Sequence, residues 1–206
     1  MVHVKICGLT SPEDATFAVC AGASAIGLNF VPTSPRRVDL ARAKEIVASV
    51  RALKQKVEIV GVVADLSVEA MRALMTDTDL DCLQLHGSES PETLTPLLPR
   101  AYKAVRIAGA ADVEVARSYP GKHVLVDAFQ EGVLGGTGRT FQWSLVKDLA
   151  SERALTLAGG LTPENVEAAV REVRPFCVDV ASGVERAPRA KDHAMVRAFI
   201  DAVRRA

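Results

Sequence analysis

The order in which apolar patterns follow one another constrains the fold of this chain more than any other feature. Each segment with strand-like alternation or a short apolar run is followed by a segment with helical periodicity. The strand-like segments cover approximately residues 2–7, 25–30, 58–64, 82–86, 101–107, 123–128, 154–158 and 176–181. The helix-like segments cover about residues 12–22, 39–53, 67–76, 91–98, 111–118, 142–150, 163–172 and 191–204. This alternation predicts a repeated α/β architecture.

Three of the predicted helices begin with the same short pattern. A hydroxyl residue is followed by proline and glutamate in Ser11-Pro12-Glu13, Ser90-Pro91-Glu92 and Thr162-Pro163-Glu164. A hydroxyl cap, proline at the first helical position and an acid in the first turn are strong start signals for a helix. The recurrence of these signals indicates that one strand–loop–helix unit is repeated.

Repeated β–α units without a linker predict a single-domain (β/α)₈ barrel (a TIM barrel) over residues 1–206. An open, doubly wound parallel sheet is the alternative, but it usually has only five or six strands. The length of 206 residues is near the lower limit for such a barrel and leaves little room for an inserted domain.

Composition excludes several classes of partner. The 25 basic residues are balanced by 25 acidic ones without a basic run, which argues against nucleic acid and against an anionic membrane surface. No stretch resembles a membrane span or a signal peptide, so we expect a cytoplasmic protein. None of the four cysteines lies in a C-x-x-C pair, and His3, His123 and His193 are not grouped with acids at metal-ligand spacing. We therefore infer no metal.

Three of the cysteines lie in apolar segments that favour small buried side chains, whereas Cys7 lies at a strand end. It closes the run Lys5-Ile6-Cys7-Gly8 and faces the same way as Lys5. Side chains alternate between the two faces of a strand, and the more uniformly apolar faces should pack on the helices. Five polar or reactive groups then converge on the barrel mouth: Cys7, Asn29, His86, Asp127 and Asp179.

Cys7 and Asp127 are the strongest candidates for catalysis. A thiol and a carboxyl on opposite sides of one pocket can act as base and acid on the same small molecule. The carboxyl needs a raised pKa to serve as the acid, and Asp179 could supply the neighbouring negative charge. The alternative for Cys7 is a buried structural cysteine.

Glycine-rich stretches predict a phosphate site. The residues are Gly135 and Gly136, then Gly159 and Gly160 after the seventh strand, then Ser182 and Gly183 after the eighth. Barrels commonly bind phosphate through backbone N–H groups after these last two strands.

Arg36 follows the second strand and could hold a substrate carboxylate, although a solvated surface arginine is the commoner outcome. His86 could shape the ligand site or be a satisfied polar group. We assign Arg36, His86 and Asp179 to substrate binding.

Six short motifs occur in the order typical of one family: Lys5-Ile6-Cys7-Gly8, Gln84-Leu85-His86-Gly87, Leu125-Val126-Asp127-Ala128, Gly135-Gly136-Thr137-Gly138, Leu157-Ala158-Gly159-Gly160-Leu161 and Val178-Asp179-Val180-Ala181-Ser182-Gly183-Val184-Glu185. With these motifs the chain resembles phosphoribosylanthranilate isomerase of tryptophan biosynthesis from end to end. Two departures are Ala181 in place of a serine and Ala190 in place of a glycine. The first removes a hydroxyl near the expected phosphate, and the second concerns a loop.

The resemblance implies a cofactor-free barrel enzyme that carries out an Amadori rearrangement of N-(5′-phosphoribosyl)anthranilate to 1-(2-carboxyphenylamino)-1-deoxyribulose 5-phosphate. It further implies that Cys7 is the general base and Asp127 the general acid. Arg36 matches the residue that contacts the anthranilate group, and the glycine loops match the phosphate site.

Three alternatives remain open. Another phosphosugar isomerase of the same barrel group, such as that of histidine biosynthesis, normally uses paired aspartates, which Cys7 disfavours. A non-catalytic barrel that binds a phosphorylated metabolite is disfavoured by the intact Cys7, Asp127 and Arg36. An interaction module would need a large exposed apolar surface, which the helix patterns do not require. The sequence leaves monomer and homodimer equally open.

Overall fold

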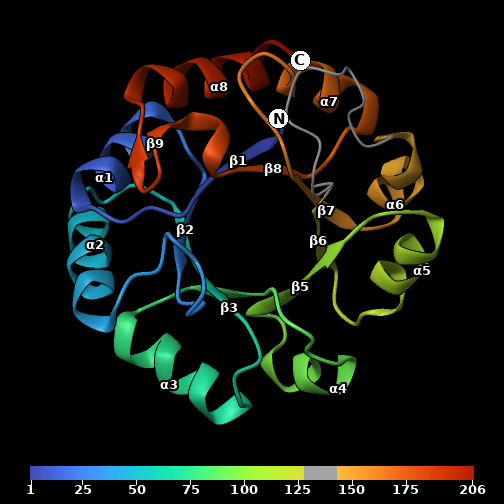
Figure 1. The fold of residues 1–206 in the computed structure, drawn as a ribbon, viewed down its shortest axis with the longest axis horizontal. Helices are drawn as coiled ribbons and strands as arrows, with labels where there is room; N and C mark the ends of the chain where they lie inside the picture. Colours follow the sequence, from blue (N-terminus) through green and yellow to red (C-terminus); the bar gives the residue numbers. More distant parts are fainter. Residues whose placement is uncertain (128–142) are drawn as a thin grey trace.

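The computed structural model describes residues 1–127 and 143–206. Within these residues, eight parallel strands are hydrogen-bonded in the order β1 to β8 and close into a barrel through pairing of β8 with β1. Figure 1 looks down this barrel and shows the helices as an outer ring. The strands are β1 (His3–Cys7), β2 (Ala25–Asn29), β3 (Glu58–Val63), β4 (Cys82–Leu85), β5 (Ala101–Arg106), β6 (His123–Asp127), β7 (Ala154–Ala158) and β8 (Cys177–Val180). The predicted (β/α)₈ barrel is confirmed.

The helices follow the strands in the predicted alternation. They are α1 (Pro12–Ala21), α2 (Leu40–Ala52), α3 (Val68–Thr78), α4 (Pro91–Leu94), α5 (Ala110–Ser118), α6 (Lys147–Glu152), α7 (Val166–Val173) and α8 (His193–Arg205), with the 3₁₀ helices η1 (Thr95–Leu97), η2 (Trp143–Val146) and η3 (Ser182–Val184). Among the described residues, no helix is long and apolar enough to cross a membrane.

Local capping explains why two of the predicted helix starts are correct. The Ser11 hydroxyl accepts a hydrogen bond from the backbone N–H of Asp14, and Pro12 occupies the first turn of α1. Ser90 caps α4 in the same way through the N–H of Thr93. The third start, at Pro163, is wrong because α7 begins at Val166.

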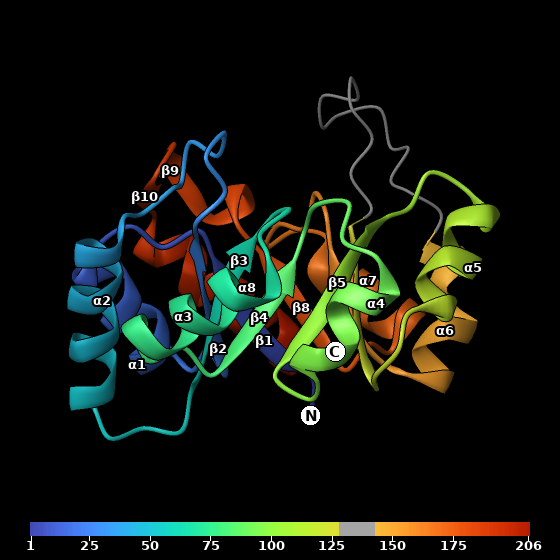
Figure 2. The same cartoon turned by 90° about the horizontal axis from the view of Figure 1, so that it is seen from below.

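Several predicted boundaries differ from the structure. The segment predicted as helix 91–98 divides into short α4 and η1, and the segment 142–150 becomes η2 followed by α6, with residue 142 outside the described range. The predicted start of the last helix at 191 is also wrong. There a small hairpin forms from β9 (Glu185–Ala187) and β10 (Ala190–Lys191), and Asp192 then caps α8. Figure 2 shows this hairpin on the side of the barrel opposite the N-terminus.

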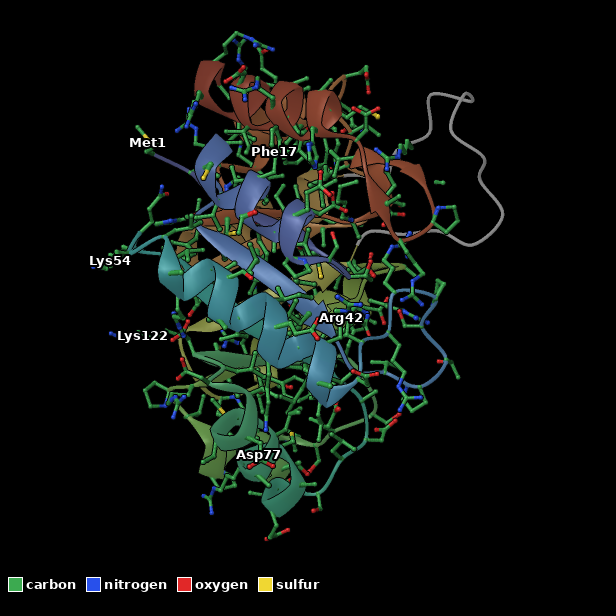
Figure 3. All side chains as sticks on the ribbon, turned by 90° about the vertical axis from the view of Figure 1, so that its left-hand side faces the viewer. Met1, Phe17, Arg42, Lys54, Asp77 and Lys122 are labelled. Atoms are coloured by element: carbon green, nitrogen blue, oxygen red, sulfur yellow. The ribbon has the colours of Figure 1, made fainter. Side chains whose placement is uncertain are left out.

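The apolar core has an outer and an inner layer. Val124 and Val126 of β6 belong to the large cluster between strands and helices, whereas Leu125 lies in a cluster inside the barrel with Val60 and Tyr102. The predicted alternation of faces is therefore confirmed on this strand. In Figure 3, Phe17 of α1 lies on the side that faces α8, and its ring stacks on His193 at the start of α8. One cysteine prediction is wrong, because Cys20 is exposed on α1.

Candidate functional site

A cavity of about 250 Å³ opens at the carboxyl ends of the strands. It brings together all of the site residues predicted within the described part of the chain: Cys7, Asn29, Arg36, His86, Asp127, Gly159, Gly160, Asp179, Ser182 and Gly183. Gly135 and Gly136 lie outside the described residues. Parallel strands carry their C-terminal residues to one rim, which is why groups from distant parts of the sequence meet here.

Cys7 ends β1 and is almost fully buried, with 8% of its surface exposed. Its sulfur lies over Gly27 of β2, where an added Cβ would come within 2.6 Å of Sγ. Burial raises the pKa of the Cys7 thiol above its ordinary value, the negative charge of Asp179 adds to this effect, and the cations Lys5 and Lys191 oppose it. In the resting protein Cys7 is therefore a thiol at neutral pH.

Asp127 ends β6 on the same cavity, together with His86. The Nε2 atom of His86 lies 3.6 Å from Oδ2 of Asp127. The other ring nitrogen, Nδ1, is 2.9 Å from Nε2 of Gln84. Because Oε1 of Gln84 accepts from Lys5, Nε2 of Gln84 is the donor and Nδ1 of His86 the acceptor. The N–H of His86 is therefore on Nε2, the ring nitrogen that faces Asp127.

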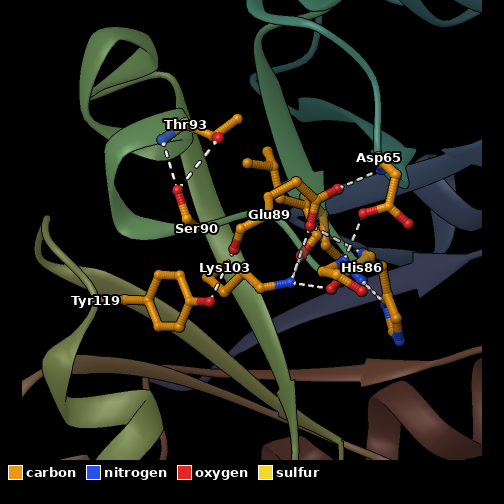
Figure 4. Close-up of polar contacts among 11 residues, drawn as sticks. Asp65, His86, Glu89, Ser90, Thr93, Lys103 and Tyr119 are labelled. Atoms are coloured by element: carbon orange, nitrogen blue, oxygen red, sulfur yellow. Dashed lines mark hydrogen bonds and ion pairs between the residues drawn. The ribbon is translucent and has the colours of Figure 1, made fainter.

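A buried ion pair fixes the loop that follows His86. Glu89 accepts hydrogen bonds from the Nζ of Lys103 at 2.9 Å, from the N–H of Gly87 at 2.9 Å and from the N–H of Asp65 at 2.8 Å. Figure 4 shows how these contacts gather beside His86. Because each of these three hydrogen bonds is buried or part-buried, the ion pair stabilises the loop geometry. The sequence patterns did not predict this cluster.

Asp179 lies inside the barrel on β8, beside Lys5 of β1 in the strand register. Its Oδ2 accepts a hydrogen bond from Lys5 Nζ at 2.7 Å. Within the described residues, its other oxygen, Oδ1, is buried without a hydrogen-bond partner. Asp179 also lines the cavity, so a ligand hydroxyl could satisfy this oxygen. Lys5, which the strand pattern placed beside Cys7 without a role, balances the carboxylate charge.

Arg36 reaches the cavity but is not a free surface cation. Its Nε and Nη2 donate to the two carboxylate oxygens of Glu185 at 2.7 and 2.6 Å. Glu185 also accepts from Lys191 Nζ at 3.0 Å, and Lys191 donates to the carbonyl of Ala181 at 2.8 Å. The β9–β10 hairpin therefore anchors the guanidinium. Glu185 belonged to a recognised motif, but its role as this anchor was missed.

Burial raises the pKa of Glu185, but the hydrogen bonds and charges of Arg36 and Lys191 outweigh it and leave that pKa below its ordinary value. Glu185 is therefore ionised at neutral pH and keeps both cations paired. A guanidinium has five N–H donors, so Arg36 retains donors for a ligand beyond those that bind Glu185.

The glycine loops after β7 and β8 border the same cavity. Gly159 and Gly160 have positive φ angles of 92° and 63°, which favour glycine. In the described residues, their N–H groups make no hydrogen bond to another backbone group. At Gly183, a side chain would collide with the carbonyl of Leu161. These glycines allow close backbone approach at a place where N–H groups can receive an anion.

The fold and the site together define a (β/α)₈-barrel protein with a buried thiol, a carboxyl and an anchored guanidinium at one cavity. The family model for "N-(5′-phosphoribosyl)anthranilate (PRA) isomerase" matches residues 4–202. The chain therefore belongs to the phosphoribosylanthranilate isomerase family and is an isomerase.

Individual relatives agree with this assignment. The chain is 48% identical to N-(5′-phosphoribosyl)anthranilate isomerase of Pseudomonas aeruginosa over 206 residues, covering 98% of this chain and 95% of the relative. The crystal structure of phosphoribosyl anthranilate isomerase from Thermotoga maritima superposes with a TM-score of 0.89 at 39% identity, over 100% of both chains. A structure of the isomerase in complex with reduced 1-(o-carboxyphenylamino)-1-deoxyribulose 5-phosphate has a TM-score of 0.88 at 37% identity, also over 100% of both chains.

Proposed function

We propose that this protein converts N-(5′-phosphoribosyl)anthranilate to 1-(2-carboxyphenylamino)-1-deoxyribulose 5-phosphate, with Cys7 as general base and Asp127 as general acid. The observation that carries the proposal is that a thiol from β1, a carboxyl from β6 and the anchored Arg36 line one cavity. The sugar of the substrate must gain and lose protons, and it lies between two anionic groups, a carboxylate and a phosphate. This cavity offers an acid and a base for the proton transfers and a cation for one anionic group.

Asp127 acts first in the proposed mechanism. Its proton is transferred to the furanose ring oxygen, the bond from C1′ to that oxygen breaks, and the ring oxygen becomes a hydroxyl. The nitrogen lone pair forms the C1′=N bond, so the product is a protonated Schiff base and an Asp127 carboxylate. His86, 3.6 Å from Asp127, is placed to contact this carboxylate as its charge develops.

Cys7 acts second. Only the fraction of Cys7 that has lost its proton to solvent reacts, and this thiolate takes the proton from C2′. The electrons of that C–H bond form the C1′=C2′ bond as the iminium is neutralised. The resulting enolamine becomes the ketone when C1′ gains a proton and the C2′ hydroxyl loses one. Because the reaction only moves protons, it needs no net oxidant or reductant.

Both ends of the substrate have a matching group in the site. The guanidinium of Arg36 is the proposed partner of the anthranilate carboxylate. The N–H groups at Gly159, Gly160, Ser182 and Gly183, with Gly135 and Gly136, are the proposed phosphate ligands. Asp179, whose Oδ1 has no hydrogen-bond partner among residues 1–127 and 143–206, and His86 are assigned to the sugar hydroxyls. The relative in complex with the reduced carboxyphenylamino-deoxyribulose phosphate supports a ligand of this class.

Loss of anthranilate-derivative fluorescence on mixing the protein with phosphoribosylanthranilate tests the activity directly. The matched controls are Cys7→Ala and Asp127→Ala, each of which should remain folded and lose turnover. Turnover of the histidine-pathway aminoaldose in place of this substrate would identify the rival isomerase. Binding of the product without any turnover would identify a non-catalytic barrel.

The proposal also covers the oligomeric state of the protein and its location in the cell. A solved relative from Thermotoga maritima is a dimeric isomerase from which monomers were generated. For this chain, monomer and homodimer both stay predictions that sedimentation at assay concentration distinguishes. A single-domain, cytoplasmic enzyme fits the free thiols of Cys7, Cys20, Cys82 and Cys177.

A further inference from the structure

Lys5 is a buried cation within the barrel, two residues before Cys7. Only 2% of its surface is exposed. Its Nζ donates to Oδ2 of Asp179 and to Oε1 of Gln84, both at 2.7 Å. The pKa of Lys5 is lowered by burial but raised more strongly by Asp179 and other neighbours, with the result that it lies well above the ordinary value. Lys5 is therefore a fixed positive charge.

Lys5 lies on the same face of β1 as Cys7. An ammonium has three N–H donors, and within the described residues two side-chain acceptors hold this one. Side chains two apart on a strand share a face, so Lys5 and Cys7 point into the same space. The charge of Lys5 and a hydrogen bond from it both lower the pKa of the Cys7 thiol. The ammonium thus lies where a thiolate at Cys7 needs a countercharge.

Gln84 extends this contact across the cavity. Its Oε1 accepts from Lys5 and from the hydroxyl of Tyr102 at 3.2 Å, while its Nε2 is 2.9 Å from Nδ1 of His86. Because both ends of the Gln84 amide are used, the side chain has one favoured orientation. Lys5 is thereby held in place by Asp179 on one side and by an oriented amide on the other.

We propose that Lys5 is a positioning residue for Cys7, whose ammonium, fixed by Asp179 and Gln84, favours the thiolate that acts as base. The inference rests on the proposed function only where it calls Cys7 the base. The favouring of the thiolate is a property of the free protein and can be measured without substrate.

Other charged groups also face Cys7, and their effects on its pKa must be distinguished from the effect of Lys5. Asp179 on β8 opposes the thiolate, whereas Lys191 on β10 and Arg36 after β2 favour it. Lys191 and Arg36 share Glu185 as a partner, and Asp179 pairs with Lys5. Removing Lys5 and removing Asp179 should therefore change the pKa of Cys7 in opposite directions, which loss of packing alone would not do.

The experiment measures the rate of Cys7 alkylation by iodoacetamide as a function of pH. The thiolate sulfur displaces iodide and forms a thioether, so the rate follows the thiolate fraction. A Cys20→Ser background removes the exposed thiol, and burial raises the pKa of Cys82 and Cys177 to about 12. Mass spectrometry of the Cys7 peptide confirms the site of modification.

In this background, Lys5→Met should slow alkylation about tenfold at a pH below the midpoint, corresponding to an upward shift of about one pH unit. Asp179→Asn should shift the midpoint downward, and Lys5→Arg should restore most of the parental rate. If Lys5→Met does not fold, the double variant Lys5→Met/Asp179→Asn, which removes both buried charges, is compared with Asp179→Asn alone. The double variant should have the higher midpoint.

An unchanged or lowered midpoint on removing Lys5, in either folded background, would overturn the proposal. Failure of the proposed function gives a different result. In that case the parent protein does not turn over phosphoribosylanthranilate, yet the alkylation midpoints still move in opposite directions.

Discussion

Replacing Arg36 by alanine tests whether the anchored guanidinium binds the substrate carboxylate. Glu185 occupies Nε and Nη2 of Arg36 at 2.7 and 2.6 Å, so the outer N–H groups are available to a ligand. A carboxylate can accept two charge-assisted hydrogen bonds from such a fork, together worth about 1.5–3 kcal/mol. We therefore expect the KM of Arg36→Ala to rise roughly 10- to 100-fold. The kcat should change less, because the carboxylate is bound alike in the ground state and the transition state.

Two further variants separate charge from orientation. Arg36→Lys keeps the positive charge but loses the planar fork, so its KM should lie between those of the parent and Arg36→Ala. Glu185→Gln keeps Arg36 but removes its charged anchor. We expect a raised KM in that variant too, although the cation that contacts the substrate is still present.

Stability provides the control for these variants. In Arg36→Ala, Glu185 keeps Lys191 as an ion-pair partner at 3.0 Å, so the buried carboxylate does not become unpaired. The free energy of unfolding in urea should therefore fall by less than the about 3–5 kcal/mol that is lost when a buried charge loses its last partner. A folded Arg36→Ala variant with parental KM and kcat would refute the assignment of Arg36 to the carboxylate.

Three other predictions concern catalysis, phosphate binding and acid stability. Cys7→Ser and Asp127→Asn should each lower kcat at least about 100-fold with little change in KM, and near-parental turnover in either would remove that residue from the mechanism. The kcat/KM profile should rise with pH above the ordinary thiol value, because burial raises the pKa of Cys7. Gly160→Glu has open space for its Cβ but strains the backbone at a φ of 63°, so we expect a modest loss of stability together with weakened binding of inorganic phosphate to the folded variant in calorimetry, and parental affinity would place the phosphate elsewhere. Burial, with the charges of Lys5 and Arg153, lowers the pKa of His123 from 6.5 to about 4. The buried neutral ring therefore costs no stability above pH 6.5, and the free energy of unfolding decreases by up to about 3 kcal/mol as the pH falls from 6.5 toward 4, because only the unfolded chain binds the proton in this range. Urea unfolding at intervals between pH 6.5 and 4 should show that the free energy of unfolding falls less steeply in His123→Gln than in the parent. An identical fall would contradict the contribution assigned to His123.

The barrel and its inward-facing residues were predictable because they depend on local periodicity. Alternation in β6 places Val124 and Val126 among the helices and Leu125 inside the barrel, as the period of two requires. Once the strand ends are known, parallel strands deliver Cys7 and Asp127 to the same rim. Neither step needs knowledge of a distant contact.

Helix starts were predictable only where the cap acts alone. Ser11 and Ser90 cap the helices that their patterns predict. Thr162 has the same sequence signature, but the Asn165 side chain accepts a hydrogen bond from the N–H of Thr162 at 2.8 Å and donates to the carbonyl of Gly160 at 2.9 Å. This local turn competes with the helix and delays it to Val166.

The partners of the site residues were not predictable, because barrel closure and the hairpin bring them from opposite ends of the chain. Lys5 and Asp179 are 174 residues apart, and Arg36 and Glu185 are 149 apart. The Lys5–Asp179 pair depends on the register between β1 and β8, and the Arg36–Glu185 pair depends on the hairpin that follows β8. No local sequence pattern specifies either one. These contacts nevertheless determine the electrostatic charge at the cavity. Lys5, Arg36 and Lys191 supply three positive charges and Asp179 and Glu185 supply two negative ones, so the linked pairs carry a net charge of about +1. The cations among them oppose part of the rise in the pKa of Cys7, and the excess positive charge attracts a substrate with anionic ends.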